Sequence, residues 1–281
     1  MSMFYYQLRN ELWKLFGKKR TYIGFGAFLI VQTVILMMFK YTRWEVRFER
    51  MLTGNGYLAA DYISALTAAL VVITPQVLLL LPLYVSLVGG DLVAKEAEDG
   101  TLRMILARPI SRLRILGVKW VAGIIFCAIL VVALGVIALC FSRFAFPWKG
   151  LFVISPVRST FAVFPANEGL LLYLFSLLFV IANAIAQLSV AFMFSCFNMK
   201  PAAATILSLS YLFMNIVMEH LPFFEDYKNW FITHHFDCWA LVFHSPLPWL
   251  EILQSEVILL GISVTAFVIG AMTFQMRDIK S

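Results

Sequence analysis

The stretch that decides the fold is WVAGIIFCAILVVALGVIALCFS, residues 120–142, which contains no Asp, Glu, Lys or Arg. A helix rises about 1.5 Å per residue, so about 20 mainly apolar residues cross the roughly 30 Å of hydrocarbon in a bilayer. A run of this length without a charge therefore predicts a helix that crosses a membrane.

Five more runs of this kind occur in the chain, and the overall composition agrees with them. Of 281 residues, 62% are hydrophobic and only 14% are charged, whereas about a quarter of the residues of a soluble domain are charged. The sequence therefore predicts an all-α integral membrane protein with a single transmembrane domain, residues 1–281. The six spans are expected at 21–40, 62–90, 115–141, 169–198, 201–221 and 252–275.

The basic residues indicate the orientation of the spans, because Lys and Arg collect in cytoplasmic loops. With six spans both termini lie on one side. If that side is the cytoplasm, 14 of the 22 Lys and Arg residues are inside and the remaining 8 are outside. We therefore expect a multi-pass protein of the cell's inner (cytoplasmic) membrane with both termini in the cytoplasm. Its basic loops border the lipid bilayer and need no nucleic-acid partner.

The residues before the first span predict an amphipathic helix. Apolar side chains recur there at spacings of four, four and three residues, and charged side chains lie between them. Such a helix is stable at the headgroup boundary of a bilayer. The alternative is a simple extension of the first span. The apolar positions are Phe4, Leu8, Leu12 and Leu15, and the charged positions are Arg9, Glu11 and Lys14.

The loop between the second and third spans, residues 91–114, has an ordered charge pattern. Its centre reads EAEDGTLRMILARPISR, residues 96–112, and is acidic first and basic second. Gly100 can end a helix in a left-handed conformation, and Thr101 can begin a new turn. Pro109 prevents a smooth continuation into the third span, for which Ser111 is a suitable N-cap. A short helix held here is well placed to dock into a partner and transmit its movement.

The same loop resembles the inner loop of permease subunits of type-2 ABC exporters. In that family an acidic residue, Gly-Thr, a Pro-Ser step, Arg and a following Lys, here Lys119, occur in this order. The resemblance implies an N-terminal interfacial helix, six spans and a cytoplasmic coupling helix between spans 2 and 3. It implies two ATPase subunits and a second permease subunit, identical or related, as partners. The alternative is a solvated loop whose charges only fix the topology. The residues that the resemblance puts at or beside the ATPase are Glu96, Glu98, Gly100, Thr101, Arg103, Pro109, Ser111 and Arg112.

The chain has no phosphate-binding loop of the G-x-x-x-x-G-K-[ST] type, which would cradle nucleotide phosphates. It also has no H-E-x-x-H or G-x-S-x-G pattern, the signatures of two classes of hydrolase. We therefore expect this chain to be no enzyme and to bind no cofactor of its own. ATP and Mg²⁺ would be bound by the partner ATPase.

Two other classes of function stay open. A secondary transporter uses ionisable groups near the bilayer midplane, and the six uncharged runs contain none. A complex of the ABC type that transmits force to an outer partner without moving cargo fits the same spans. The polar residues that are candidates for a transport pathway are Gln76, Asn183, Gln187 and Asn215.

Two features within the spans have both a functional and a structural interpretation. Asn183 and Gln187 are four residues apart and share one helix face, where they can contact cargo or join two helices by a hydrogen bond. Pro75 and Pro82 remove backbone donors from the second span and predict a kink.

The outer segment 222–250 is rich in aromatic residues and predicts one or two short helices at the membrane boundary. It contains a dense group of His234, His235, Asp237 and Cys238. Metal binding is conceivable there, but adjacent histidines do not share a helix face, so the spacing favours ordinary interface packing. No disulfide is predicted.

Overall fold

The computed structural model describes residues 2–42, 44–106, 110–155 and 160–276. Within these residues, six helical segments are long and apolar enough to cross a membrane, and each corresponds to one predicted span. The second consists of α5 (Ala65–Pro75), η1 (Gln76–Leu80) and α6 (Leu81–Glu98). The others are α2 (Lys19–Tyr41), α8 (Arg112–Ala145), α9 (Ala166–Cys196), α10 (Pro201–Glu219) and α13 (Trp249–Met276).

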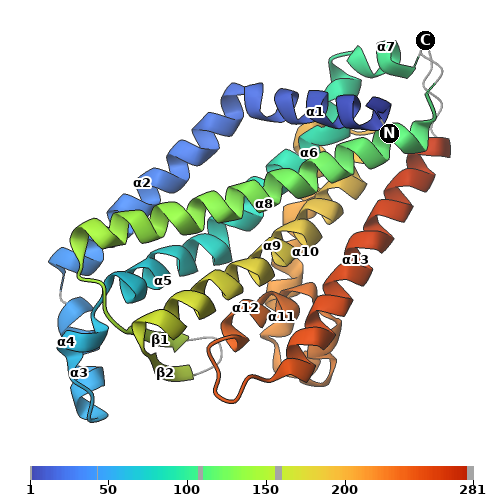
Figure 1. Ribbon diagram of the computed structural model, residues 1–281. Coiled ribbons are helices and arrows are strands. Elements are labelled where there is room, and N and C mark those ends of the chain that lie inside the picture. The colour runs from blue at the N-terminus through green and yellow to red at the C-terminus, as the bar shows by residue number, and fades with distance from the viewer. Residues whose placement is uncertain (1, 43, 107–109, 156–159, 277–281) are drawn as a thin grey trace.

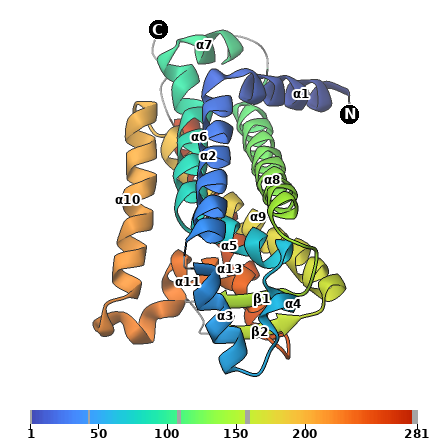
Figure 2. The same cartoon turned by 90° about the vertical axis from the view of Figure 1, so that its left-hand side faces the viewer.

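The long helices run side by side, and the shorter elements lie at the two ends of the bundle (Figure 1). At one end, which we call the termini end, are α1 (Ser2–Gly17), α7 (Thr101–Leu106) and the last turn of α13. At the other, the far end, are α3 (Trp44–Gly54), α4 (Ala59–Tyr62), η2 (Pro222–Trp230), α11 (Ile232–Phe236) and α12 (Cys238–Leu241). Figure 2 shows α10 at one edge of the bundle, leading at the far end into the segment that contains α11.

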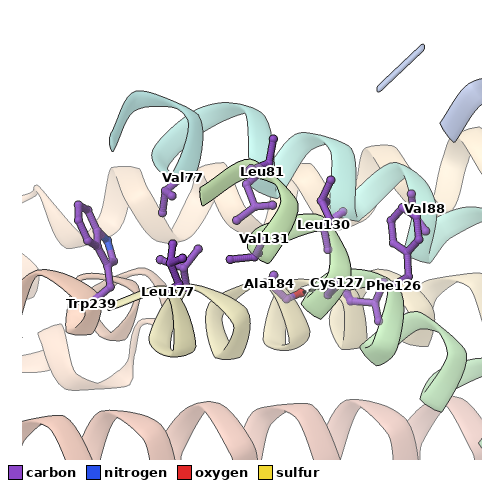
Figure 3. Packing of buried hydrophobic residues seen from close by; sticks show 14 of the residues in the cluster. Val77, Leu81, Val88, Phe126, Cys127, Leu130, Val131, Leu177, Ala184 and Trp239 are labelled. Atoms are coloured by element: carbon purple, nitrogen blue, oxygen red, sulfur yellow. Dashed lines mark hydrogen bonds between the residues drawn. The ribbon is translucent and has the colours of Figure 1, made fainter. Parts of the chain in front are cut away.

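Helix α9 packs against α6, α8, α10 and α13 and therefore lies at the centre of the bundle. Aliphatic side chains fill the space between α9 and its neighbours, as Figure 3 shows for Leu81 of α6, Leu130 and Val131 of α8, and Leu177 of α9. In lipid, such helices associate through close packing rather than through exclusion of water. Shape complementarity at these contacts thus determines the arrangement of the spans.

Helix α6 approaches α9 closely because it has glycine at the crossing point. A Cβ atom at Gly89 would lie 2.7 Å from Ala191 Cβ and 2.9 Å from the carbonyl oxygen of Leu188. Neither backbone can move away cheaply, so only glycine permits this separation. Nearby, the hydroxyl of Ser195 accepts hydrogen bonds from the backbone N–H groups of Val93 (3.0 Å) and Ala94 (2.9 Å). Packing and hydrogen bonds therefore fix the last turns of α6 to α9.

The second span is irregular after Pro75. Helix α5 ends at this proline, and residues 76–80 form a π-helical turn before α6 begins. The predicted kink therefore takes the form of a wider turn, which is a common feature of functional sites in helices. The side chain of Gln76 lies here and accepts a hydrogen bond from Gln32 Nε2 of α2 at 3.4 Å.

The fold is almost entirely helical, as predicted, and contains an element that was not predicted: β1 (Leu151–Ser155) and β2 (Thr160–Phe164) form an antiparallel hairpin at the far end. Residues on alternating sides of β1 enter two different hydrophobic clusters. Leu151 and Val153 belong to the main core, whereas Phe152 packs with Phe39 and Phe48. An apolar segment buried on both faces is stable as a strand. The amphipathic helix α3 was also not predicted.

We expect Gly89→Leu to lower the thermal stability of the protein, because the side chain would force α6 away from α9. Overpacking of this kind costs about 1–3 kcal/mol. Unfolding can be followed with a thiol-reactive dye in a Cys140→Ser background, because Cys127, Cys196 and Cys238 are buried and Cys140 is exposed. Gly117→Leu is the matched control, since no atom lies within 4 Å of a Cβ at that position. Equal melting temperatures for the two variants would contradict this account of the crossing.

Candidate functional site

The described part of the segment between α6 and α8 consists of a turn and a short helix. Helix α6 ends at Glu98, Gly100 has φ of 73°, and α7 begins at Thr101. No atom lies within 4 Å of a Cβ placed at Gly100, so the positive φ alone explains the glycine. The hydroxyl of Thr101 donates a hydrogen bond back to the carbonyl oxygen of Glu96 at 3.3 Å. The chain therefore turns sharply away from the second span and starts a short helix.

Helix α7 lies at the termini end with one side against the bundle and another side outward (Figure 1). Leu102 is buried in the main hydrophobic core, whereas the side chain of Met104 is 67% exposed. The helix is thus anchored by an apolar contact on one side and exposed on another.

A group of four charges, centred on a buried lysine, joins α1, α6 and α8 next to this segment. The ammonium nitrogen of Lys119 lies 2.9 Å from Glu11 Oε2 and 2.8 Å from Glu96 Oε1. Lys14 lies 2.8 Å from Glu11 Oε1 and 3.1 Å from Glu96 Oε1. The side chain of Lys119 is only 2% exposed, and a charge so buried is tolerated only when it is paired. We call these four residues the charge cluster.

The charge cluster shifts the pKa values of its two residues on α1, Glu11 and Lys14. Burial alone would raise the pKa of Glu11, but the positive charge of Lys119 and hydrogen bonds from Lys14 and Lys119 outweigh it, so the pKa is below its ordinary value. Burial alone would lower the pKa of Lys14, but its hydrogen bond and attraction to Glu11 outweigh burial, so the pKa is raised. Both groups are therefore held in their charged forms.

The other residues predicted to contact an ATPase have different environments. Glu98 is half exposed and pairs with Lys95 at 2.8 Å. Ser111 occupies the N-cap position of α8 with extended backbone angles, but its side chain makes no capping hydrogen bond. Arg112 donates to the carbonyl oxygen of Gln275 at 3.1 Å and so links α8 to the end of α13. Pro109 and the side chain of Arg103 lie outside the described residues.

Sequence reasoning missed the role of Glu11 and Lys14. Their positions on the charged side of α1 indicated an interfacial helix, and nothing in the pattern named their partner. Glu96 and Lys119 were both noted as parts of one motif, and the structure brings their side chains together. The available signal was the combination of a Glu on α1 with a Lys at the start of a span, where an unpaired charge is costly.

The four predicted pathway residues separate into two groups. Asn183 and Gln187 of α9 both line a cavity of about 680 Å³, whose lining also includes residues of η2 and α11 at the far end. Gln76 and Asn215 are buried elsewhere: Gln76 bonds to Gln32, and Asn215 donates to the carbonyl oxygen of Tyr211 in its own helix.

Asn183 and Gln187 also join helices by hydrogen bonds, as their structural interpretation predicts. Gln187 Nε2 of α9 donates to the hydroxyl oxygens of Ser86 of α6 (2.7 Å) and Ser208 of α10 (3.1 Å). Asn183 Nδ2 donates to the carbonyl oxygen of Phe236 of α11 at 2.7 Å. These two residues therefore join the walls of the cavity.

The histidine group of the aromatic segment is divided among different partners. Three short helices, η2, α11 and α12, form this segment. His234 Nδ1 lies 3.2 Å from Glu219 Oε1, and His235 Nδ1 lies 3.1 Å from Ser255 Oγ. Among the residues that the structure describes, no group of three His, Cys, Asp or Glu side chains has an arrangement suited to a metal ion.

We expect Lys119→Met to reduce the free energy of unfolding by about 3 kcal/mol, because it removes the buried cation shared by Glu11 and Glu96 and leaves them with the more exposed Lys14. The loss should largely disappear when Glu11→Gln and Glu96→Gln are added. Unfolding in mixed detergent micelles measures both variants. Lys95→Met, which breaks a pair at the surface, is the control and should leave the free energy of unfolding almost unchanged. A Lys119→Met variant as stable as this control would refute the importance of the charge cluster.

The charge cluster also predicts a dependence of stability on pH. Because the folded pKa of Glu11 is below its ordinary value of 4.5, its contribution is complete above about pH 4.5 and is lost as the pH falls through the folded pKa. The difference in melting temperature between the wild type and Glu11→Gln should therefore shrink on acidification below about pH 4.5. A difference that stays constant or grows at acid pH would contradict the prediction.

Comparison with known protein families gives one finding. No curated protein matches the chain. A family model does match residues 28–280, a range that includes Glu96, Lys119 and the cavity residues of α9 but not α1. The chain therefore belongs to the family described as "Protein of unknown function (DUF2705)".

Proposed function

We propose that the chain is the membrane-spanning permease subunit of an ATP-binding cassette transporter that exports a substrate with energy from a separate ATPase subunit. The single observation that supports this most is the geometry of α7. It is a short helix with an outward surface at Met104, a sharp turn at Gly100 before it, and an anchored residue, Leu102, beneath it. A helix of this kind can receive a push from a partner and pass it to the second span.

The path of that movement follows covalent and ionic links. Helix α7 follows α6 directly in the chain, after the turn at Gly100. Helix α6 is held to α8 and α1 by the ion pairs of Lys119 with Glu96 and Glu11. At its other end α6 leads into η1, whose residues Val77–Leu79 line the cavity. A displacement of α7 therefore reaches the wall of the cavity along one helix, and the π-helical turn is a point at which that helix can adjust.

The proposal includes the partners and the location of the complex. Two ATPase subunits would supply ATP and Mg²⁺ binding, and a second permease subunit, identical or related, would complete the membrane domain. The termini end would lie in the cytoplasm of the cell and the far end outside its inner membrane, as the excess of Lys and Arg near the termini end favours.

The proposal is tested by purifying the tagged chain in mild detergent, identifying the copurified proteins by mass spectrometry, and measuring ATPase activity. A subunit with a phosphate-binding loop should copurify. Gly100→Pro should reduce the ATPase activity at least about tenfold, because proline requires a negative φ where the chain has φ of 73°. Charge reversal at Arg103 should also reduce it, with membrane insertion unchanged.

Gly56→Pro is the matched control, because Gly56 has φ of 82° and equally open surroundings but lies at the far end. It should leave the ATPase activity close to that of the wild type. A chain that purifies without an ATPase in several detergents, and that moves substrate in response to a proton or sodium gradient, would be a secondary transporter instead. Normal ATPase activity in Gly100→Pro would exclude α7 as the coupling element.

A further inference from the structure

The cavity beside α9 has the size and lining of a site for a small molecule. Its volume of about 680 Å³ is within the range of roughly 300–1,000 Å³ found for ligand pockets. Aliphatic side chains from η1, α6 and α10 form much of its lining, and those of Leu78 and Leu79 are also exposed at the surface of the protein. The aliphatic residues are Val77, Leu78, Leu79, Leu81, Leu212 and Ile216.

Two buried amide groups in this cavity have oxygen atoms without a hydrogen-bond donor among the described residues. They are Asn183 Oδ1 and Gln187 Oε1, on side chains whose residues are 5% and 1% exposed. The orientation of Asn183 is fixed, because the carbonyl oxygen of Phe236 can only accept and Nδ2 must face it. An unsatisfied buried acceptor of this kind is unfavourable. A ligand that supplies N–H or O–H groups would remove this cost.

The mouth of the cavity has an excess of negative charge. Three carboxylates, Glu219, Glu225 and Asp237, line it together with one lysine, Lys228, which lies 3.3 Å from Glu225. Glu219 accepts hydrogen bonds from Thr233 Oγ1 at 2.6 Å and His234 Nδ1 at 3.2 Å, and a carboxylate has about four acceptor positions. The mouth therefore attracts cations and can bind further donors.

We propose that this cavity binds an amphipathic cation, a molecule with an apolar body and an ammonium group that bears N–H donors. The aliphatic wall takes the apolar body, and the carboxylate of Glu219 and the amide oxygens of Asn183 and Gln187 take the donors. The inference that the bound molecule is transported cargo rests on the proposed function, whereas binding itself depends only on this chain.

The test measures binding to the full chain in lipid nanodiscs without any ATPase. The probe is dansylcadaverine, a fluorescent primary amine, compared with its trimethylammonium analogue and with a dansyl amino acid that is anionic. Dansylcadaverine should bind most tightly, the trimethylammonium analogue about tenfold more weakly because its cationic group has no N–H donors, and the anion least. Glu219→Gln and Asn183→Leu should each weaken the binding of dansylcadaverine about tenfold.

Matched control variants are Glu168→Gln and Asn215→Leu, which remove the same groups from residues that do not line the cavity. Both should bind the probe as the wild type does. If Asn183→Leu does not fold, Glu219→Gln alone decides the outcome, because it preserves shape and removes only charge. Equal binding of all three probes, or equal binding by the cavity and control variants, would overturn the proposal. If the probe binds specifically here and the copurification experiment recovers no ATPase, the binding site is retained and the ABC assignment is rejected.

Discussion

The termini end of the bundle depends on one interaction, the burial of the Lys119 ammonium group between the carboxylates of Glu11 and Glu96. Three helices, α8, α1 and α6, contribute one charge each to it. Separating them would leave a charge buried and unpaired, which costs several kcal/mol. The last turns of α6 are therefore held to α1 and to the start of α8. Helix α7 follows directly after this fixed end of α6.

Helix α6 connects the charge cluster to the cavity. Between them, Gly89 and Ser195 hold α6 close to the central helix α9. Beyond Leu81 the regular helix gives way to the π-helical turn of η1, whose residues Val77–Leu79 line the cavity. In the proposed transporter the tightly packed helix α6 thus transmits movement, and the π-helical turn η1, next to the cargo site, changes its conformation in response. The order of these features along one span is what the mechanism requires.

Local chemistry made part of this structure predictable. The six spans were predictable from long uncharged runs, and the turn at Gly100 was predictable from the backbone freedom of glycine. Both features depend only on residues that are close together in the chain. The pairing of Glu11 with Lys119 joins residues 108 positions apart, and no local pattern specifies it. The hairpin was missed because β1 is a short apolar run, and its burial on both faces depends on α3 and α5. Asn183 and Gln187 were correctly placed on one face, but their cavity is completed by α10 and α11.

The most direct test of the account is a photo-cross-link from α7 in cells. A photoreactive phenylalanine is placed at Met104, which is exposed at the termini end, and at Leu58, which is exposed at the far end. After irradiation, the cross-linked proteins are identified by mass spectrometry. The account predicts that Met104 captures an ATPase subunit with a phosphate-binding loop and that Leu58 does not. Capture of such a subunit from neither position, in a chain that is correctly inserted, would contradict it.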